Sequence, residues 1–210
     1  MDYLGDNFLE ANKKSNNPKK DYKTLCDILS KIYKKSREHN DSLEFIKEMK
    51  DRMIRYYRDY LIPAGHIKEK DLSFIKQYEI KTLNSEYSCF AVFDFTPEDV
   101  YILDNKLKYP DPKHSLIGNP IIDLACFAGL ARDVYVMKKS DYGYELLKDF
   151  ALGEVSELLK IDKIKASKIF NFGRALQCSL SSRFRIKKPD KSKLFANKSL
   201  HYLELAMGGD

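Results

Sequence analysis

Three aspartates in the middle of the chain have the residue type and spacing of a small acidic site: Asp94, Asp99 and Asp111. Asp94 and Asp99 flank a short loop in which Pro97 restricts the backbone. Carboxylates held close together repel one another unless they share a proton or a cation, and Mg²⁺ prefers oxygen ligands. The cluster is therefore expected to bind Mg²⁺ or to supply a general base. The alternative is that these are turn and cap residues, because aspartate also satisfies local backbone hydrogen bonds.

Short β-strands are expected to position these side chains. Residues 89–93 and 100–103 are runs of apolar, β-branched or aromatic residues, and 107–109 is a third such run. Asp104 and Asn105 lie between the second and third runs and are typical of a tight turn. A hairpin built in this way returns the chain toward its starting point, so it brings the three aspartates near one another.

The rest of the chain is expected to be largely helical, because apolar residues recur at the three- and four-residue spacing of one helix face. Helices are predicted over residues 21–39, 42–62, 68–79, 121–138, 143–159, 163–180 and 191–206. Residues 12–20 are polar and contain Pro18, so they are predicted to form a flexible loop. The expected fold class is α+β, mainly α-helical, with one small β-hairpin that carries the acidic loop.

The acidic segment resembles the catalytic core of the aminoglycoside phosphotransferase and choline kinase-like superfamily, which are small-molecule kinases with a protein-kinase-like fold. These proteins have, in order, His-Gly-Asp-x-x-x-x-Asn, a hairpin, a metal-binding Asp, and Gly-(Asp/Asn)-Pro-x-x-Asp-(Leu/Ile)-Ala. In this chain residues 92–94, Val-Phe-Asp, stand at the position of His-Gly-Asp, and Asp99 stands at that of the Asn. Asp111 stands at the metal-binding Asp, and residues 118–125, GNPIIDLA, match the closing motif.

The resemblance implies a kinase-like C-terminal lobe that uses ATP and Mg²⁺ to transfer phosphate to a hydroxyl group of a small molecule. By the same resemblance Asp94 is the catalytic base, and Asp111 and Asp99 hold Mg²⁺ on the nucleotide. Asp123 is implied to be structural, holding the catalytic loop through backbone hydrogen bonds. Phosphoryl transfer of this kind depends mostly on positioning and on neutralising charge.

The ends of the chain also resemble this lobe. Residues 1–6, MDYLGD, are similar to the hinge between the two lobes, which implies that Asp2, Tyr3 and Leu4 lie on the adenine side of the nucleotide. Residues 172–176, FGRAL, are similar to a helix near its end. A single lobe over 1–210 is thus expected, with a hinge-like segment (1–11), a flexible loop (12–20), helices (21–87), the catalytic-type loop and hairpin (88–117) and C-terminal helices (118–210).

Three departures from the family pattern bear on activity. Val92 replaces the His that braces the loop, and Asp99 replaces the Asn, which removes an amide donor and adds a negative charge. The sequence begins at the hinge-like segment, so the N-lobe with its lysine is expected to be absent or to come from another chain. An ATP site with only one wall is expected to bind weakly and to exclude water poorly. Catalysis by this chain alone is therefore not expected.

Two other functions remain open from the sequence. One is a pseudokinase-type module that keeps the helical scaffold to bind a protein partner, and an apolar patch left by the N-lobe then favours self-association. The other is a nucleic-acid-binding protein, suggested by the net charge of +6 and testable by its salt dependence. Nucleic acid is the less favoured partner, because the basic runs 13–23 and 183–193 are interpreted first as solvated surface.

The composition of the chain excludes several classes of protein. Of the 210 residues, 43% are hydrophobic and 32% charged, a globular balance that excludes disordered and fibrous classes. No stretch is apolar enough to span a membrane and no secretory signal is recognisable, so a cytoplasmic protein is expected. The cysteines lack metal-ligand spacing and are expected to be reduced core residues: Cys26, Cys89, Cys126 and Cys178.

Overall fold

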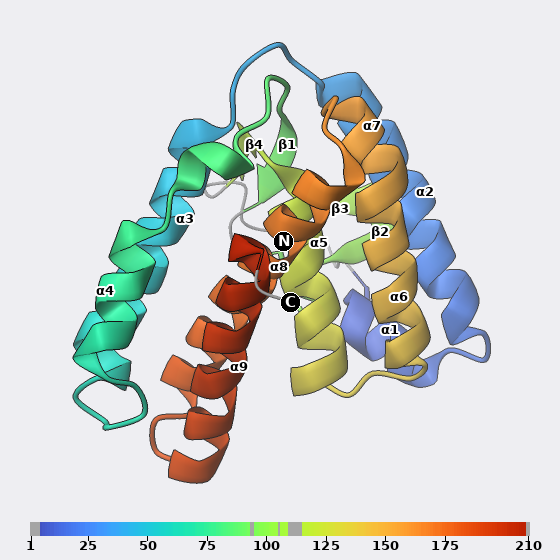
Figure 1. The fold of residues 1–210 in the computed structure, drawn as a ribbon. Helices are drawn as coiled ribbons and strands as arrows, with labels where there is room; N and C mark the ends of the chain where they lie inside the picture. Colours follow the sequence, from blue (N-terminus) through green and yellow to red (C-terminus); the bar gives the residue numbers. More distant parts are fainter. Residues whose placement is uncertain (1–4, 93–94, 105, 109–114, 209–210) are drawn as a thin grey trace.

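The computed structural model describes residues 5–92, 95–104, 106–108 and 115–208 (Figure 1). Its α-helices are α1 (Phe8–Lys14), α2 (Pro18–Ser36), α3 (Leu43–Tyr56), α4 (Glu69–Gln77), α5 (Pro120–Gly129), α6 (Ser140–Phe150), α7 (Ser156–Leu158), α8 (Lys163–Phe184) and α9 (Pro189–Met207). Shorter helical turns extend or link them: η1 (Tyr57–Leu61), η2 (Ile80–Leu83), η4 (Leu130–Val134) and η5 (Ala151–Val155). The strands are β1 (Cys89–Val92), β2 (Tyr101–Leu103), β3 (Lys106–Lys108) and β4 (Ser115–Gly118). The mainly helical class with a small β component is confirmed.

Helix caps explain where the N-terminal helices begin. Residues 12–20 were predicted to be a flexible loop, but α1 continues to Lys14 and α2 begins at Pro18. Asn7 caps α1 and Asn17 caps α2, each by accepting a backbone N–H of the first turn. The proline ring is compatible with the first position of a helix, where its missing N–H costs nothing. The loop prediction is therefore wrong except at the short connection between the two helices.

The later helices match the sequence pattern, with two kinds of difference. The predicted helices over 42–62, 121–138 and 143–159 each change from an α-helical to a π-helical turn, at η1, η4 and η5. The helix predicted over 163–180 continues to Phe184 as α8, whereas the helix predicted over 121–138 ends at Val134. Periodicity of apolar residues indicates a helix but does not distinguish these turn types or the last turn.

The strands form two separate antiparallel pairs. β2 and β3 make the expected hairpin, with Tyr101 opposite Lys108, and Asp104 at its turn has a positive φ of 51°. β1 pairs instead with β4, a strand that the sequence analysis did not predict. In this second pair Val92 lies opposite Ser115. Along the chain, β1 therefore comes before the β2–β3 hairpin and β4 comes after it.

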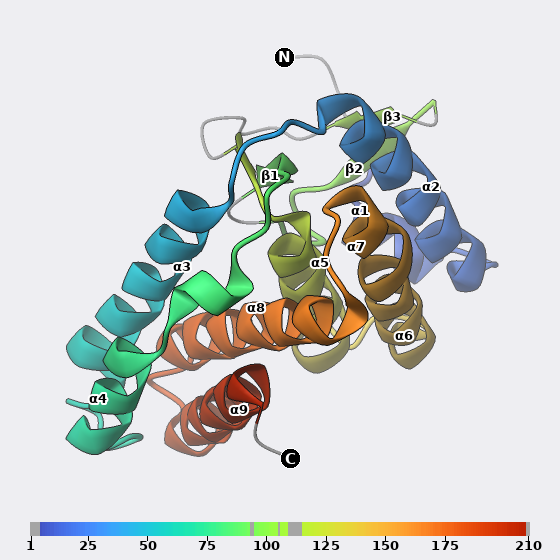
Figure 2. The same cartoon turned by 45° about the horizontal axis from the view of Figure 1, so that its top comes forward.

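The core is arranged around α8. Figure 2 shows α8 crossing between the side formed by α3 and α4 and the side formed by α5, α6 and α7, with α9 beneath it. A Cβ on Gly173 would lie 2.8 Å from the Cβ of Ala125, so glycine allows α8 to approach α5 closely. All four cysteines are free, and all but the half-buried Cys126 are buried. In the described ranges, no helix has the length and apolarity needed to cross a membrane.

Candidate functional site

The first turn of α5 anchors the end of β1. Asn119 caps α5 with its Oδ1, and Pro120 occupies the first helical position. Asp123 is 4% exposed, and its Oδ2 accepts the backbone N–H of Val92. A buried carboxylate is expensive unless it receives hydrogen bonds, and a buried backbone N–H needs an acceptor. Each group therefore satisfies the other, and the chain is held in place just before Asp94.

The pairing of β1 with β4 brings the two ends of the acidic segment to one sheet. Val92, which precedes Asp94, lies opposite Ser115, which follows Asp111. A Cβ on Gly118 would lie 2.5 Å from the ring of Phe45, so glycine at this position allows α3 to pack over β4. The glycine of the closing motif thus has a packing role beside the hydrogen-bonding roles of its neighbours.

The buried phenol of Tyr33 lies close enough to Asp123 to be affected by its charge, and Cys89 lies close to Tyr33. Burial, and then the charge of Asp123, raise the pKa of the Tyr33 phenol well above its ordinary value. Burial likewise raises the pKa of the Cys89 thiol to about 11. Both groups are therefore protonated at neutral pH and can stay in this environment without adding a second negative charge.

The loop that follows residue 94 is a tight turn closed by a threonine. The Thr96 hydroxyl accepts the Glu98 backbone N–H at 3.2 Å and donates to Asp99 Oδ2 at 2.7 Å. The backbone N–H of Asp99 also donates to the Thr96 carbonyl at 3.1 Å. The other carboxylate oxygen, Oδ1, receives no hydrogen bond from the described residues. One oxygen of Asp99 therefore fixes the side chain, and the other remains able to accept a ligand.

The N-terminal helix supports this loop from the other side. The first helical N–H of α1, from Phe8, donates to the Val100 carbonyl at 2.6 Å, and the Leu9 N–H donates to the Pro97 carbonyl at 3.0 Å. The Phe8 ring also packs edge-on against Phe127 of α5, with ring centroids 5.5 Å apart. The loop is therefore held between α1 and α5.

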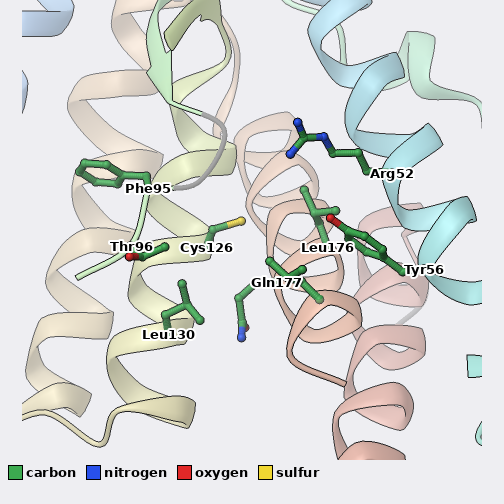
Figure 3. A pocket seen from close by; sticks show the side chains of 9 residues that line it. Arg52, Tyr56, Phe95, Thr96, Cys126, Leu130, Leu176 and Gln177 are labelled. Atoms are coloured by element: carbon green, nitrogen blue, oxygen red, sulfur yellow. The ribbon is translucent and has the colours of Figure 1, made fainter. Parts of the chain in front are cut away.

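Two adjoining cavities separate the loop from α3 and α8. The smaller has a volume of about 30 Å³, and Figure 3 shows Arg52 and Tyr56 reaching into it from α3, opposite Thr96 and Cys126. The larger has a volume of about 520 Å³ and extends toward the end of α8. The residues that line both cavities are Arg52, Tyr56, Thr96, Leu130 and Leu180.

The larger cavity has charged and aromatic walls. Its acidic residues, Glu98 and Asp99, come from the loop, whereas Arg183 and Arg185 come from the end of α8. Tyr135 is also in the lining, and burial, together with the neighbouring Glu98 carboxylate, raises the pKa of its phenol. Tyr135 is therefore a neutral hydrogen-bonding group at ordinary pH.

The structure describes two of the predicted site residues. Asp99 lines the larger cavity, and Asp123 anchors Val92. The others lie outside the described residues: Asp2, Tyr3, Leu4, Asp94 and Asp111. Among the side chains that the structure describes, no group of three or more His, Cys, Asp or Glu is placed to hold a metal ion. The predicted Mg²⁺ site thus stays a prediction, because two of its three aspartates, Asp94 and Asp111, lie outside the described residues.

The sequence analysis missed the arginines at the cavity. It interpreted the basic run 183–193 as solvated surface, but Arg183 and Arg185 at its start are half-buried and line the larger cavity. The available signal was their position at the end of a helix, where Arg183 lies in the last turn and Arg185 is the C-cap. A pattern of this kind does not reveal which other element the side chains will face.

No family model matches this sequence, and no curated protein and no solved structure was found to match it. Any functional assignment therefore depends on the residues and the geometry described above.

Proposed function

We propose that this chain is the C-terminal lobe of a small-molecule phosphotransferase, which transfers the γ-phosphate of ATP to a hydroxyl group. The observation that carries the proposal is the hydrogen bond from the Val92 N–H to the buried Asp123 carboxylate. It fixes the chain just before Asp94. This is the role that the resemblance to the aminoglycoside phosphotransferase and choline kinase-like superfamily implies for the closing aspartate.

Two further observations support the proposal. The pairing of Val92 with Ser115 connects the segment before Asp94 with the segment after Asp111. The cavity of about 520 Å³ beside Asp99 has the volume of a small-molecule site. A hydroxyl acceptor in this cavity would lie next to the loop that begins at Asp94.

The proposed reaction requires one base and a cation. The acceptor oxygen forms a bond to the γ-phosphorus, its proton passes to Asp94, and the bond to the β–γ bridging oxygen breaks to release ADP. Asp111 and Asp99 would hold Mg²⁺, and their carboxylate oxygens are the donor type that this ion prefers. When bound, the ion supplies positive charge that offsets the phosphates. The hydrogen bond from the Thr96 hydroxyl to Asp99 Oδ2 supports this role, because it fixes one carboxylate oxygen and leaves the other for the ion.

The nucleotide also needs a covering lobe. The described residues contain only two two-stranded sheets, both within the acidic segment and its flanks. The proposal therefore includes a covering N-lobe supplied by a further polypeptide segment. Until it is supplied, ATP binding is expected to be weak.

Calorimetric titration of the purified chain with ATP, with and without Mg²⁺, tests the proposal. Binding is expected to require Mg²⁺ and to weaken by about tenfold or more in Asp111→Asn, because a carboxylate ligand is lost. Asp104→Asn is the matched control. It removes the same charge at the hairpin turn, where its positive φ suits asparagine, so it is expected to bind ATP as the wild type does.

Three results would count against a phosphotransferase. These are ATP binding that ignores Mg²⁺, an equal loss in both aspartate variants, and no binding at millimolar ATP. The last result, combined with a stable complex with a protein partner, would favour the pseudokinase-type module. If phosphoryl transfer is detected, Asp94→Ala is expected to abolish it while the melting temperature stays unchanged.

A further inference from the structure

We infer that the larger cavity selects an acceptor that carries an anionic group, a phosphate or a carboxylate, in addition to its reacting hydroxyl. This inference rests on the proposed function, because it names the chemical class of acceptor for the same site. Its basis is the set of charges that line the cavity and the groups that those charges contact.

Two arginines at the end of α8 supply the positive charge. Arg183 and Arg185 line the cavity and are half-buried, and within the described ranges neither forms an ion pair with a carboxylate. The Cζ of Arg183 lies 4.6 Å from the ring centroid of Tyr60 and 5.2 Å from that of Tyr56. Nη1 of Arg185 donates to the Ser181 carbonyl at 3.0 Å.

These contacts hold the guanidinium groups without neutralising them. Aromatic faces attract a cation but carry no net charge, and a guanidinium has five N–H donors. Arg183 and Arg185 therefore keep donors that a phosphate or carboxylate can accept. Arginine is well suited to this task, since its planar fork matches the oxygen spacing of both anions.

The other charges of the cavity predict the orientation in which the acceptor binds. Arg52, the third arginine of the lining, has its Nε 3.5 Å from Glu48 Oε1, so a carboxylate compensates it. Glu98 and Asp99 belong to the loop, where the proposed cation would offset negative charge. The hydroxyl of the acceptor is therefore expected to face the loop, and its anionic group is expected to face α8.

The cavity mouth adds apolar contact and a positive field. Phe184 lines the cavity and is 71% exposed, and Tyr60, beside Arg183, is 38% exposed. The run 183–193 contains six cations (Arg183, Arg185, Lys187, Lys188, Lys191 and Lys193) and one acid, Asp190. This net positive charge attracts anions to the end of α8 in general, whereas the preference among sugars is assigned to the two arginines that line the cavity.

Calorimetric titration of the full chain with four compounds that share one sugar ring tests the inference. The probes are glucose 6-phosphate, glucuronate, glucose and glucosamine, and inorganic phosphate is titrated as the bare anion. At least one of the two anionic sugars is expected to bind about tenfold or more tightly than both glucose and glucosamine. Inorganic phosphate is expected to compete with it. The stronger of the two anionic sugars distinguishes a phosphate from a carboxylate as the recognised group.

Two double variants locate the interaction. Arg183→Gln with Arg185→Gln is expected to remove the preference for the anionic sugars. Lys191→Gln with Lys193→Gln makes the same change of net charge in the same basic run, but outside the cavity lining, and is expected to retain it. If the arginine double variant melts at a lower temperature, Arg183→Lys with Arg185→Lys replaces it, with a several-fold weaker affinity expected from the loss of the planar fork.

Several results would overturn the inference. Glucosamine binding as tightly as both anionic sugars would do so, as would an equal loss of affinity in the arginine and lysine variants. No binding of either anionic sugar or of inorganic phosphate at millimolar concentration would also overturn it. Binding of a single-stranded oligonucleotide alone would point to a polyanion instead.

The titrations contain no ATP, so they separate this inference from the proposed function. Anion binding through Arg183 and Arg185, with no Mg²⁺-dependent ATP binding, would leave the anion site standing and remove the phosphotransferase. Mg²⁺-dependent ATP binding without any preference for anionic sugars would leave the phosphotransferase standing and remove the anion site.

Discussion

Two arginines of one helix, Arg174 in the middle of α8 and Arg183 at its end, occupy opposite environments. Arg174 is fully buried, whereas Arg183 is half-buried at the edge of a cavity. Both guanidinium groups lie over aromatic rings, but Arg174 also pairs with the carboxylate of Asp133, whereas Arg183 has no carboxylate partner among the described side chains. The residue type is the same, so the surroundings alone separate a structural cation from a candidate ligand-binding one.

Arg174 is held by a network of charged and polar partners, although its Nε has no hydrogen-bond partner among the described residues. Its Nη2 donates to Asp133 Oδ2, and its Nη1 donates to Gln177 Oε1 at 2.7 Å. Asp133 also lies 3.2 Å from the Nε of Arg132 and 3.6 Å from the Nζ of Lys198. The network therefore ties η4 to α8 and α9. A buried charge is tolerated only when it is compensated in this way.

An arginine that has no acid beside it carries more information about function than a buried, paired one. Burying a charge costs free energy, so the fold itself must supply a partner wherever a cation is fully enclosed. A half-buried guanidinium such as that of Arg183 has no such requirement, because water still reaches it. Its open donors are therefore the more informative signal of a ligand.

The largest expected effect comes from replacing the buried arginine, Arg174. Arg174→Met is expected to lower the free energy of unfolding by about 3 kcal/mol, because Asp133 loses its principal partner inside the protein. Arg183→Met is expected to change it by about 0.5 kcal/mol or less, as for most surface substitutions. Urea denaturation of both variants measures the difference. Similar losses in the two variants would show that burial and pairing do not distinguish Arg174 from Arg183 in stability.

A second substitution tests the Arg174 network and leaves every charged residue in place. A Cβ on Gly129 would lie 1.1 Å from Nη1 of Arg174, so Gly129→Ala must displace the guanidinium from Gln177. A loss of about 2 kcal/mol is expected from this overpacking. In the Arg174→Met background the same alanine is expected to cost much less, and a double-mutant cycle measures this coupling. Additive losses would show that Gly129 acts independently of Arg174.

The smallest expected effect concerns acid pH. Burial raises the pKa of the Asp133 carboxyl, but Arg174 and Arg132 outweigh it and hold the pKa below its ordinary value of 3.8. A group with a lowered pKa stabilises the fold above its unfolded pKa, and this contribution is lost as pH falls through the folded value. The stability of the wild type is therefore expected to drop below about pH 4.

The variant Asp133→Asn isolates this contribution. Its stability is expected to be lower at neutral pH and to fall less steeply in the acid range, because the titrating group is gone. Thermal melts of both proteins at a series of pH values check the difference in slope. Parallel slopes would assign the acid sensitivity to other carboxylates.

The sequence predicted the secondary structure of the molecule better than its site. Helices appeared close to the predicted ranges because apolar periodicity, N-caps and prolines act within one or two turns. The expected β2–β3 hairpin has its turn within the same short stretch of chain. β4 was missed because a short strand is stabilised by its partner, β1, which is distant along the chain.

Local patterns of residues predict the mainly helical class, the hairpin and the aspartates at which chemistry is proposed. They also include the closing motif whose Asp123 holds Val92. No local pattern shows that Arg174 is enclosed with Asp133, 41 residues away, while Arg183 on the same helix faces a cavity. Capping and periodicity act over one or two turns, whereas burial and charge pairing depend on which distant elements meet.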